Sequence, residues 1–446
     1  MVGHRCQKLK WFLLISCLSL ISCLSLIFGQ VGLGQQAEPA GDSRTPDAVV
    51  DATTLTGKVM CGYQGWFSCP DDGGQLGWTH WARTTRRPFG PGNVTVDLWP
   101  DIRELSPQER FRTRFNHSDG RPAEVYSSAN EKTIGRHFRW MRDYGIDGVF
   151  MQRFANGLDS PRLKAQKDKV LFHAHDAASK TGRVLAVMYD LSGLRRGQVA
   201  RISDDWKQLK RDGITHGGRY LNHRGKPLVA VWGVGFSDDR EYSLAECAEL
   251  IDALKADGCA VMLGVPSWWR EQKRDAVADA SLHQILEKAD VLSPWTIGRY
   301  RSPQEASLHA NRVWKPDLDW CVQHEIDFLP VVFPGFSWKN LHGGELDAIP
   351  RLKGKFLWTQ MIAAKRSGAK MIYVAMFDEV DEGTAIFKCS NDPPVGENVS
   401  FLTYEGLPTD YYLRLTGEGG RMLRGQIPDD GPLLMSVPTP SIRPPK

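Results

Sequence analysis

The sequence predicts an α/β protein with a (β/α)8 TIM barrel and a long insertion after the first strand. Eight short apolar segments of strand character alternate with segments of helical periodicity. Several helical segments end in Gly just before the next strand, and roughly 370 residues separate the two linker-like regions. Eight βα units in one domain are typical of a closed barrel. An open doubly wound sheet is the alternative, but no Gly-rich phosphate loop follows the first strand.

The predicted strands are short and rich in branched aliphatic residues. In the last one, the apolar run from Met371 to Met376 contains two β-branched residues and an aromatic one, as expected of a buried parallel strand. The eight predicted strands are Gly57–Tyr63, Ile146–Gln152, Arg183–Tyr189, Pro227–Trp232, Cys259–Val265, Asp290–Trp295, Ile326–Phe333 and Ala369–Phe377.

Helical spacing is clearest in Asn130–Tyr144, where Ile134, Phe138 and Met141 follow the i, i+4, i+7 pattern. Leu244–Ala256 and Leu357–Lys365 are further predicted helices. Glycine tolerates the left-handed backbone of a helix C-terminus better than other residues. The predicted C-cap glycines are Gly145, Gly182, Gly258 and Gly368.

The insertion runs from Ser68 to Glu124, directly after the first predicted strand. Loops at the C-terminal ends of barrel strands build the active face. We therefore expect this segment to cover the barrel mouth, with Trp78, His80 and Trp81 near the cleft.

The N-terminal segment, residues 1–34, has the composition of a signal peptide. Basic residues precede an apolar stretch, which is followed by small and polar residues. We expect cleavage after Gly34 and export to the periplasm or the exterior. Lipid attachment at Cys17 or Cys23 is one alternative, since both follow Leu-Ile-Ser. A retained membrane anchor is another, because the stretch is borderline in length for a span.

Composition divides the rest of the chain into a linker at residues 35–50, a catalytic domain at 51–426 and a Pro-rich tail at 427–446 that we expect to be disordered. The chain has 56 Lys and Arg against 52 Asp and Glu, for a net charge of +4. The two signs are mixed along the chain without a basic stripe, so we expect no nucleic-acid partner. We also expect no stable membrane span once the N-terminal segment is removed.

Export affects how the cysteines are interpreted. Cys61 and Cys69 flank a short aromatic loop, and in an oxidising compartment their spacing suggests a disulfide. The chain has no Cys-x-x-Cys or His-x-x-x-His pair, which argues against a structural zinc site. We expect no metal ion and no other cofactor.

Four carboxylates stand in five positions directly after the last predicted strand. Glycoside hydrolysis needs one protonated carboxyl and a second carboxylate. Glu379 and Glu382 lie three residues apart in this loop, and their repulsion would keep one of them protonated near neutral pH. They are the predicted catalytic pair, with Asp378, Asp381 and Asp190 as alternatives. Backbone amides of the loop are the expected partners of Asp378 and Asp381.

Trp or Tyr follows most of the predicted strands. Barrel interiors favour branched aliphatic residues, so a ring of aromatic side chains at the mouth indicates a ligand with flat apolar faces. A sugar has such faces and a polar rim, and we therefore expect a carbohydrate substrate. The predicted substrate-binding residues are Tyr63, Gln64, Trp66, Arg153, Asp190, Trp232, Trp268, Trp295, Tyr300, Trp338 and Asp378.

Two motifs resemble glycoside hydrolase family 99, the endo-α-mannosidases and endo-α-1,2-mannanases, and its relatives, including family 71-like proteins. The segment Asp378–Thr384 is similar to the family's Asn-Glu-Trp-x-Glu-Gly-Thr. Tyr126–Ser128, followed by a helix and Gly145–Val149, is similar to its Tyr-Ser-Ser segment and second strand. The resemblance implies a retaining reaction through a 1,2-anhydro sugar. Glu379 would then act as base on the 2-hydroxyl, and Glu382 as general acid and then base.

The sequence departs from this family at positions that bear on specificity. Asp378 and Val380 replace Asn and Trp of the motif, and Tyr189–Ser192 replaces a mannoside-binding segment similar to His-Ile-Glu-Pro. The substrate is therefore left open between α-mannan and a glycan containing xylose or arabinose. A glycan-biosynthesis glycosyltransferase and a non-catalytic glycan-binding barrel are alternatives. A metal-dependent hydrolase would use the loop carboxylates with His80 or His342.

Overall fold

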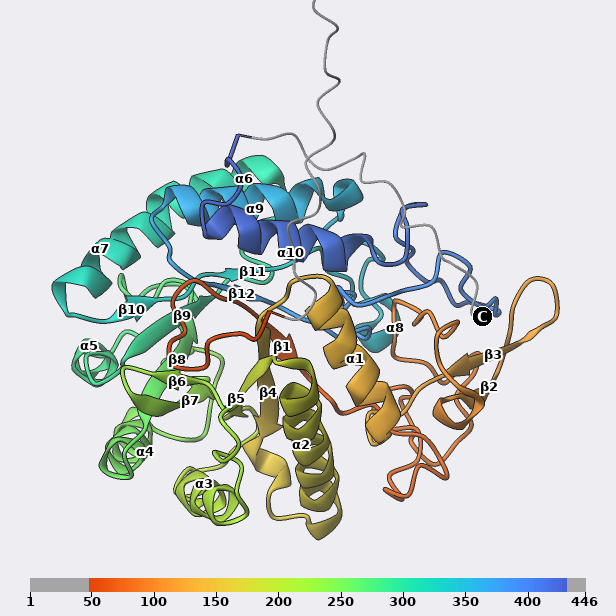
Figure 1. The fold of residues 1–446 in the computed structure, drawn as a ribbon, viewed down its shortest axis with the longest axis horizontal. Coiled ribbons are helices and arrows are strands. Elements are labelled where there is room, and N and C mark those ends of the chain that lie inside the picture. The colour runs from red at the N-terminus through yellow and green to blue at the C-terminus, as the bar shows by residue number, and fades with distance from the viewer. Residues whose placement is uncertain (1–47, 431–446) are drawn as a thin grey trace, which may run out of the picture. The chain divides into compact units, whose positions relative to one another are not determined.

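The computed structural model describes residues 48–430, which form a barrel of eight parallel strands (Figure 1). Each strand lies where the sequence predicts one, which confirms the predicted fold class. In barrel order the strands are β1 (Val59–Tyr63), β4 (Gly148–Phe154), β5 (Val184–Asp190), β7 (Lys226–Trp232), β8 (Ala260–Pro266), β9 (Val291–Trp295), β10 (Asp327–Phe328) with β11 (Val331–Val332), and β12 (Ile372–Val374).

The barrel closes through the seventh strand, which is broken into β10 and β11. β10 pairs in parallel with β9, and β11 pairs in parallel with β12, which in turn pairs with β1. Pro330 lies at the break and has no N–H to donate. Its carbonyl still accepts from Tyr373 N at 3.0 Å, and Leu329 N donates to Leu292 O at 2.9 Å. The strand thus changes neighbours partway along, which the continuous apolar run did not indicate.

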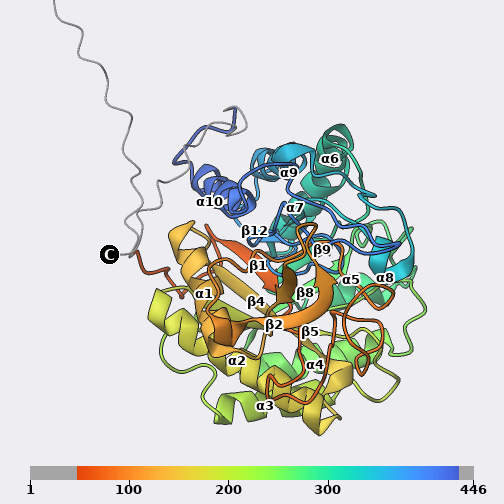
Figure 2. The same cartoon turned by 90° about the vertical axis from the view of Figure 1, so that its right-hand side faces the viewer.

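Helices surround the strands on the outside, as the two perpendicular views show (Figures 1 and 2). The predicted C-cap glycines Gly145, Gly182, Gly258 and Gly368 all have positive φ, between 68° and 96°. Within residues 48–430 no helix is long and apolar enough to cross a membrane. The helices are α1 (Glu131–Asp143), α2 (Pro161–Thr181), α3 (Arg201–Arg211), α4 (Leu244–Ala256), α5 (Ser281–Leu286), α6 (Pro303–His309), α7 (Lys315–Gln323), α8 (Lys339–His342), α9 (Lys355–Arg366) and α10 (Tyr411–Leu423).

The long insertion after β1 lies at the C-terminal mouth of the barrel, as predicted. It contains the antiparallel hairpin β2 (Phe111–Asn116) and β3 (Pro122–Val125). Buried Asp97 fixes it to the segment after β11, because its carboxylate accepts from Ser337 Oγ at 2.5 Å and from the backbone N–H groups of Lys339 and Asn340 at 2.8 Å. Asp97 N also donates to Val380 O in the acidic loop at 2.9 Å.

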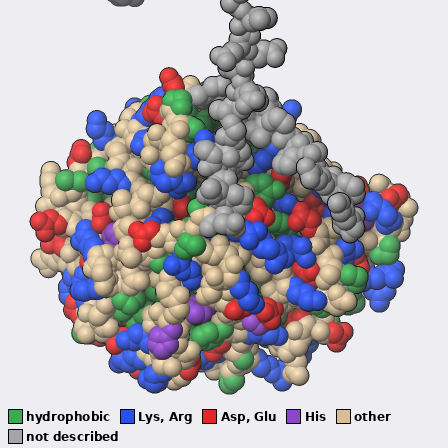
Figure 3. Space-filling model, in the orientation of Figure 1, with side chains coloured by type: hydrophobic (Ala, Val, Ile, Leu, Met, Phe, Trp, Pro, Cys, Tyr) green, Lys and Arg blue, Asp and Glu red, His purple; other side chains and the backbone are tan. Residues whose placement is uncertain are grey.

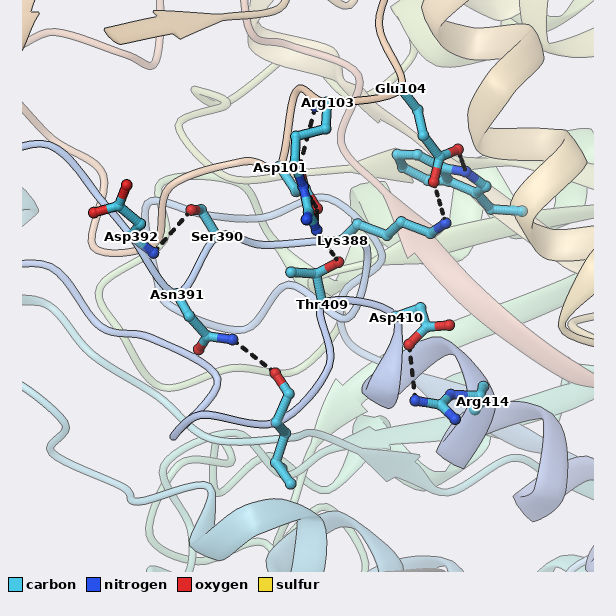
Figure 4. A network of polar contacts seen from close by, with 12 residues as sticks. Asp101, Arg103, Glu104, Lys388, Ser390, Asn391, Asp392, Thr409, Asp410 and Arg414 are labelled. Carbon is cyan, nitrogen blue, oxygen red and sulfur yellow. Dashed lines mark hydrogen bonds and ion pairs between the residues drawn. The ribbon is translucent and has the colours of Figure 1, made fainter. Parts of the chain in front are cut away.

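A second polar network holds the insertion against the C-terminal part of the domain (Figure 4). Glu104 accepts from Trp140 Nε1 of α1 at 2.8 Å and pairs with Lys388, beyond β12. Arg103 forms an ion pair with Asp101 and donates to Thr409 Oγ1 at 3.3 Å. The Glu104–Lys388 and Arg103–Thr409 contacts join residues 284 and 306 positions apart, and they tie the insertion to the C-terminal part of the domain.

The predicted Cys61–Cys69 disulfide is wrong. All six cysteines of residues 48–430 are buried free thiols. Cys61 lies within β1, paired with Val149 of β4 and Val374 of β12. Cys69 Sγ instead donates to Tyr126 O at 3.2 Å. The two thiols have separate packing environments, and burial raises the pKa of both.

Charged side chains of both signs are interspersed on the face shown in Figure 3.

The short strand β6 (Asn222–His223) extends the sheet locally by pairing antiparallel with β7. The predicted signal peptide and most of the predicted linker and Pro-rich tail lie outside the described residues.

Candidate active site

The acidic loop after β12 forms a compact turn over the end of β1. Phe377 N donates to Gly62 O at 2.7 Å, which continues the β1–β12 contact beyond the strand. Thr384 N and Ala385 N both donate to Glu379 O, at 3.2 and 2.9 Å, and close the turn. Glu379 and Glu382 are therefore carried by backbone that is fixed at both ends.

Glu379 is 5% exposed, and its carboxylate has two side-chain donors. Gln64 Nε2 donates to Oε1 at 2.5 Å, and Thr384 Oγ1 donates to Oε2 at 2.7 Å. Burial raises the pKa of Glu379 well above its usual range, and the nearby Glu382 and Asp381 raise it further. The two donors oppose this shift because they stabilise the ionised form.

The side chain of Glu382 is partly exposed to solvent, although protein atoms closely surround its carboxylate. Its backbone carbonyl accepts from Ser337 N at 2.9 Å, which links the acidic loop to the segment after β11. Burial raises the pKa of Glu382 to about 7, with a contribution from Asp381, while a hydrogen bond from Trp338 opposes the shift. The pKa values of both neighbouring carboxyls are thus raised, and shifts of this kind are typical of groups that act in acid–base chemistry near neutral pH.

The two aspartates of the loop have different surroundings. Asp378 is fully buried, and its oxygens accept from the backbone N–H groups of Gln64 and Gly65 at 2.8 and 2.9 Å. It therefore pairs with backbone amides, as expected, but these amides belong to the segment after β1 and not to the acidic loop itself. Asp381 Oδ2 lies 3.4 Å from His80 Nδ1 of the insertion, so its partner is a side chain and not the expected loop amide.

Inward-facing residues of several strands converge beneath this loop. Tyr373 of β12 accepts a 3.0 Å hydrogen bond from Gln152 Nε2 and packs against Trp295 at 6.3 Å between ring centroids. Trp295 packs edge-to-face with Trp232 at 5.4 Å. Burial raises the pKa of Tyr373, and the negative charges of Glu379 and Asp190 raise it further, so these carboxyls lie near the same hydroxyl.

Space for these side chains comes from inward-facing glycines. A Cβ on Gly264 of β8 would lie 2.4 Å from Trp232 Cδ1. One on Gly62 of β1 would lie 2.5 Å from the Tyr373 hydroxyl oxygen. Asp190 is in register with Trp232, and its Oδ1 accepts from Ser192 N at 2.7 Å. Burial raises the pKa of this carboxyl too.

Trp66 and His80 form one wall of the mouth. Their rings are stacked, with centroids 3.8 Å apart and planes 4° from parallel. Both line a pocket together with Gln64, Gln152 and Phe154. On the other side of the acidic loop, Trp338 is 40% exposed. Trp78 and Trp81 are buried instead, packed against Phe89, so of the three insertion residues only His80 reaches this pocket.

Some unpaired polar atoms line the mouth. Four buried side-chain atoms around the acidic loop have no hydrogen-bond partner among residues 48–430: Gln64 Oε1, Trp66 Nε1, Trp232 Nε1 and Asp381 Oδ1. Buried polar groups are nearly always paired in folded proteins. Donors and acceptors side by side suit a ligand with many hydroxyl groups.

Several predicted substrate-binding residues have partners within the fold. Asp378 is one of them, since it is fully buried and accepts from two backbone N–H groups. Tyr63 neighbours Gln64, so strand alternation turns it outward, where its hydroxyl lies 2.9 Å from His137 Nδ1 of α1. Tyr300 is buried against Phe333 and donates to Gln360.

Trp268 and Arg153 also have neighbouring side chains as partners. Trp268 has Arg274 over its ring at 4.3 Å and His309 stacked on it at 5.3 Å. Arg153 also turns outward from β4, and its Nε and Nη2 bind both carboxylate oxygens of Asp205 in α3. Trp268 thus has its packing partners within the fold. Arg153 is paired with Asp205 but still lines the pocket beside Trp66 and His80, and its Nη1 has no hydrogen-bond partner among residues 48–430.

Tyr373 and Thr384 are site residues that the sequence analysis did not single out. Tyr373 stands inside an apolar run, where an aromatic residue is ordinary core. Thr384 is the last residue of the Glu-x-x-Glu-Gly-Thr motif, which was a signal for its role. Within residues 48–430, no group of three or more His, Cys, Asp or Glu side chains is arranged to hold a metal ion.

No model of a known protein family matches this sequence, and no curated protein matches it. Several solved structures are similar to this protein. A GH99 endo-α-mannosidase from Bacteroides thetaiotaomicron has a TM-score of 0.59 at 18% identity, covering 83% of this chain and 99% of that one. A structure of the GH99 enzyme with bis-tris propane gives 0.57 at 19% identity, covering 84% and 99%. At these identities the similarity shows a shared barrel fold.

Proposed function

We propose that this protein is an exported glycoside hydrolase in which Glu379 and Glu382 are the catalytic pair. The observation that carries the proposal is the position of these two glutamates. They lie on one rigid loop at the C-terminal mouth of a (β/α)8 barrel, where burial and mutual repulsion raise the pKa of Glu379 and burial raises that of Glu382. The fold shared with a GH99 endo-α-mannosidase supports the same class of reaction.

The roles follow from the different partners of the two carboxyls. Glu379 has two side-chain donors, Gln64 and Thr384, which fix its orientation and favour its ionised form. It suits a base that takes the proton of the sugar 2-hydroxyl. Glu382, with a pKa of about 7 and a partly exposed side chain, suits the acid that protonates the leaving oxygen.

The reaction would then retain configuration in two steps. The 2-oxygen attacks the anomeric carbon as Glu382 protonates the departing sugar, and the product is a 1,2-anhydro intermediate. Glu382 next takes a proton from water, which opens the anhydro ring, and the proton on Glu379 returns to the 2-oxygen. Trp66 and Trp338 provide aromatic surface on either side of the loop for sugar rings. The substrate class that we propose is an α-mannan or a glycan containing xylose or arabinose.

A digestion screen over these polysaccharides with product analysis identifies the substrate, and two variants then test the mechanism. Glu379→Gln and Glu382→Gln should each lower turnover by roughly 100-fold or more. An aryl glycoside with a good leaving group should partly rescue Glu382→Gln but not Glu379→Gln, because the 2-hydroxyl must still be activated. The exposed Glu397→Gln is the matched control and should retain full activity.

The outcomes separate the class of enzyme from its mechanism. Normal cleavage of a 2-deoxy glycoside by the wild-type protein would exclude the anhydro intermediate and leave the glycosidase assignment intact. Full activity in both Gln variants would remove the assignment. Activity should also survive EDTA, because both catalytic groups are carboxyls of the chain.

A further inference from the structure

One flank of the barrel mouth carries positive charge that the fold does not neutralise. The pocket lined by Trp66, His80 and Phe154 is also lined by Lys167 of α2 and by Arg153 of β4. The Lys167 ammonium lies 5.9 Å from the centre of the Phe154 ring. Both cationic side chains therefore border the same space as the aromatic wall beside the catalytic loop.

Lys167 has no acidic partner. Among residues 48–430, Lys167 forms no ion pair and no side-chain hydrogen bond, and the only charges that act on it are those of Arg153 and the more distant Asp190. It is half-buried, and burial followed by repulsion from Arg153 lowers its pKa to about 8. A desolvated ammonium is costly unless an anion compensates it.

The neighbouring ion pairs do not neutralise the positive charge of Lys167. Arg153 and Lys164 share the carboxylates of Asp168 and Asp205 in a closed network, with contacts of 2.6 to 3.6 Å. The two positive charges of this network are balanced by its two carboxylates, so no carboxylate of the network remains to balance Lys167. Asp190 also attracts Lys167, but the two side chains are too far apart for an ion pair. In addition, burial disfavours the ionised form of Asp190.

Arg153 also has an unused donor. Its Nε and Nη2 contact Asp205 and Asp168, whereas the buried Nη1 has no hydrogen-bond partner. Arg153 is only 2% exposed, so water cannot compensate freely for the missing acceptor. One pocket is therefore lined by two cationic side chains, one with an unpaired ammonium and one with an unpaired guanidinium N–H.

We propose that this flank is a subsite for a negatively charged substituent of the glycan, such as a uronic acid carboxylate or a phosphate ester. An anion here would accept from Lys167 and from Arg153 Nη1, while the sugar that bears it packs against the Trp66–His80 wall. This inference rests on the proposed function, since it assigns the class of glycan that the same mouth accepts. It predicts a preference for acidic over neutral glycans.

The test compares binding of charged polymers with binding of their neutralised forms. Glucuronoxylan and its carboxyl-reduced form make the carboxylate pair, and phosphomannan and the dephosphorylated mannan make the phosphate pair. Affinity is measured in a Glu382→Gln background to prevent turnover. Lys167→Gln removes the charge at similar length. Lys169→Gln, at an exposed position on the same helix, is the matched control.

Lys167→Gln should weaken binding of the charged member of one pair roughly tenfold, the scale of a lost hydrogen bond to a charged group. Binding of the neutral member should change less than about twofold, and Lys169→Gln should alter neither. Added salt should weaken only the charged interaction. The pair that responds identifies the carboxylate or the phosphate as the ligand.

Equal binding of charged and neutral polymers by the protein with Lys167 intact would overturn the subsite. So would an equal loss for both members in Lys167→Gln, because Lys167 would then act only by supporting the fold around Asp190. Turnover of some neutral glycan without binding of any of the four polymers would overturn the subsite and leave the glycosidase standing. Absence of both binding and turnover would overturn the proposed function as well.

Discussion

Gln64, the first residue after β1, donates a 2.5 Å hydrogen bond from Nε2 to Oε1 of Glu379, 315 positions later in the chain. The backbone N–H of the same Gln64 donates to Asp378. The first and last strands of the barrel are thus joined at the mouth by one residue. This contact orients the carboxyl of Glu379, which we propose to be catalytic, through the pairing of β1 with β12.

Replacing Gln64 should therefore impair catalysis without unfolding the protein. Gln64→Ala removes a donor that stabilises ionised Glu379, so the pKa of Glu379 should rise further. We expect kcat/KM to fall roughly 10- to 100-fold and the acidic limb of its pH profile to move to higher pH. Gln323→Ala, at an exposed position, is the control. An unshifted pH profile would contradict this role.

Glu382→Gln should stabilise the protein at alkaline pH. The folded state raises the pKa of Glu382 to about 7, so its ionisation opposes folding. This cost is absent below the unfolded pKa, grows between about pH 4.5 and 7, and is complete above the folded pKa. The variant should gain on the order of 1 kcal/mol at pH 8 and almost nothing at pH 4, measured by urea unfolding. A gain that is equal at both pH values would exclude this explanation.

Asp97→Ala should detach the insertion from the barrel mouth. The change leaves Ser337 Oγ and two backbone N–H groups without their acceptor in a buried position. We expect a loss of roughly 2–4 kcal/mol in the free energy of unfolding. Asp392→Ala, which removes an exposed ion-pair partner of Arg121, should cost under about 1 kcal/mol. Equal losses in the two variants would refute the anchoring role.

The cysteines should all titrate as thiols. The folded protein should react with none of its six buried thiols from Cys61 to Cys389 within minutes, because burial raises their pKa values and shields them. Denaturation of the chain without residues 1–34 should release six thiols without reductant. A count of four would indicate one disulfide and contradict the structure.

The sequence was sufficient to predict the barrel and the position of the acidic loop. Both depend on local patterns: apolar runs of strand length, helical spacing, and glycines at helix ends. The position of Glu379 and Glu382 at the barrel mouth was predictable for the same reason, since a polar cluster at the end of a parallel strand lies at the C-terminal edge of the sheet wherever the other strands are. Their catalytic role stays a prediction.

The partner of each side chain was decided only by the tertiary structure. The direction of a strand residue depends on the pairing of the closed sheet, which turns Tyr63 toward α1 and leaves Gln64 at the mouth. Arg153 was predicted to bind substrate, yet its charge is shared with Asp205, 52 residues away on α3. Apolar periodicity specifies which residues are buried, because burial depends on local pattern. Hydrogen bonds and ion pairs between distant segments depend on distances that exist only once the barrel has closed.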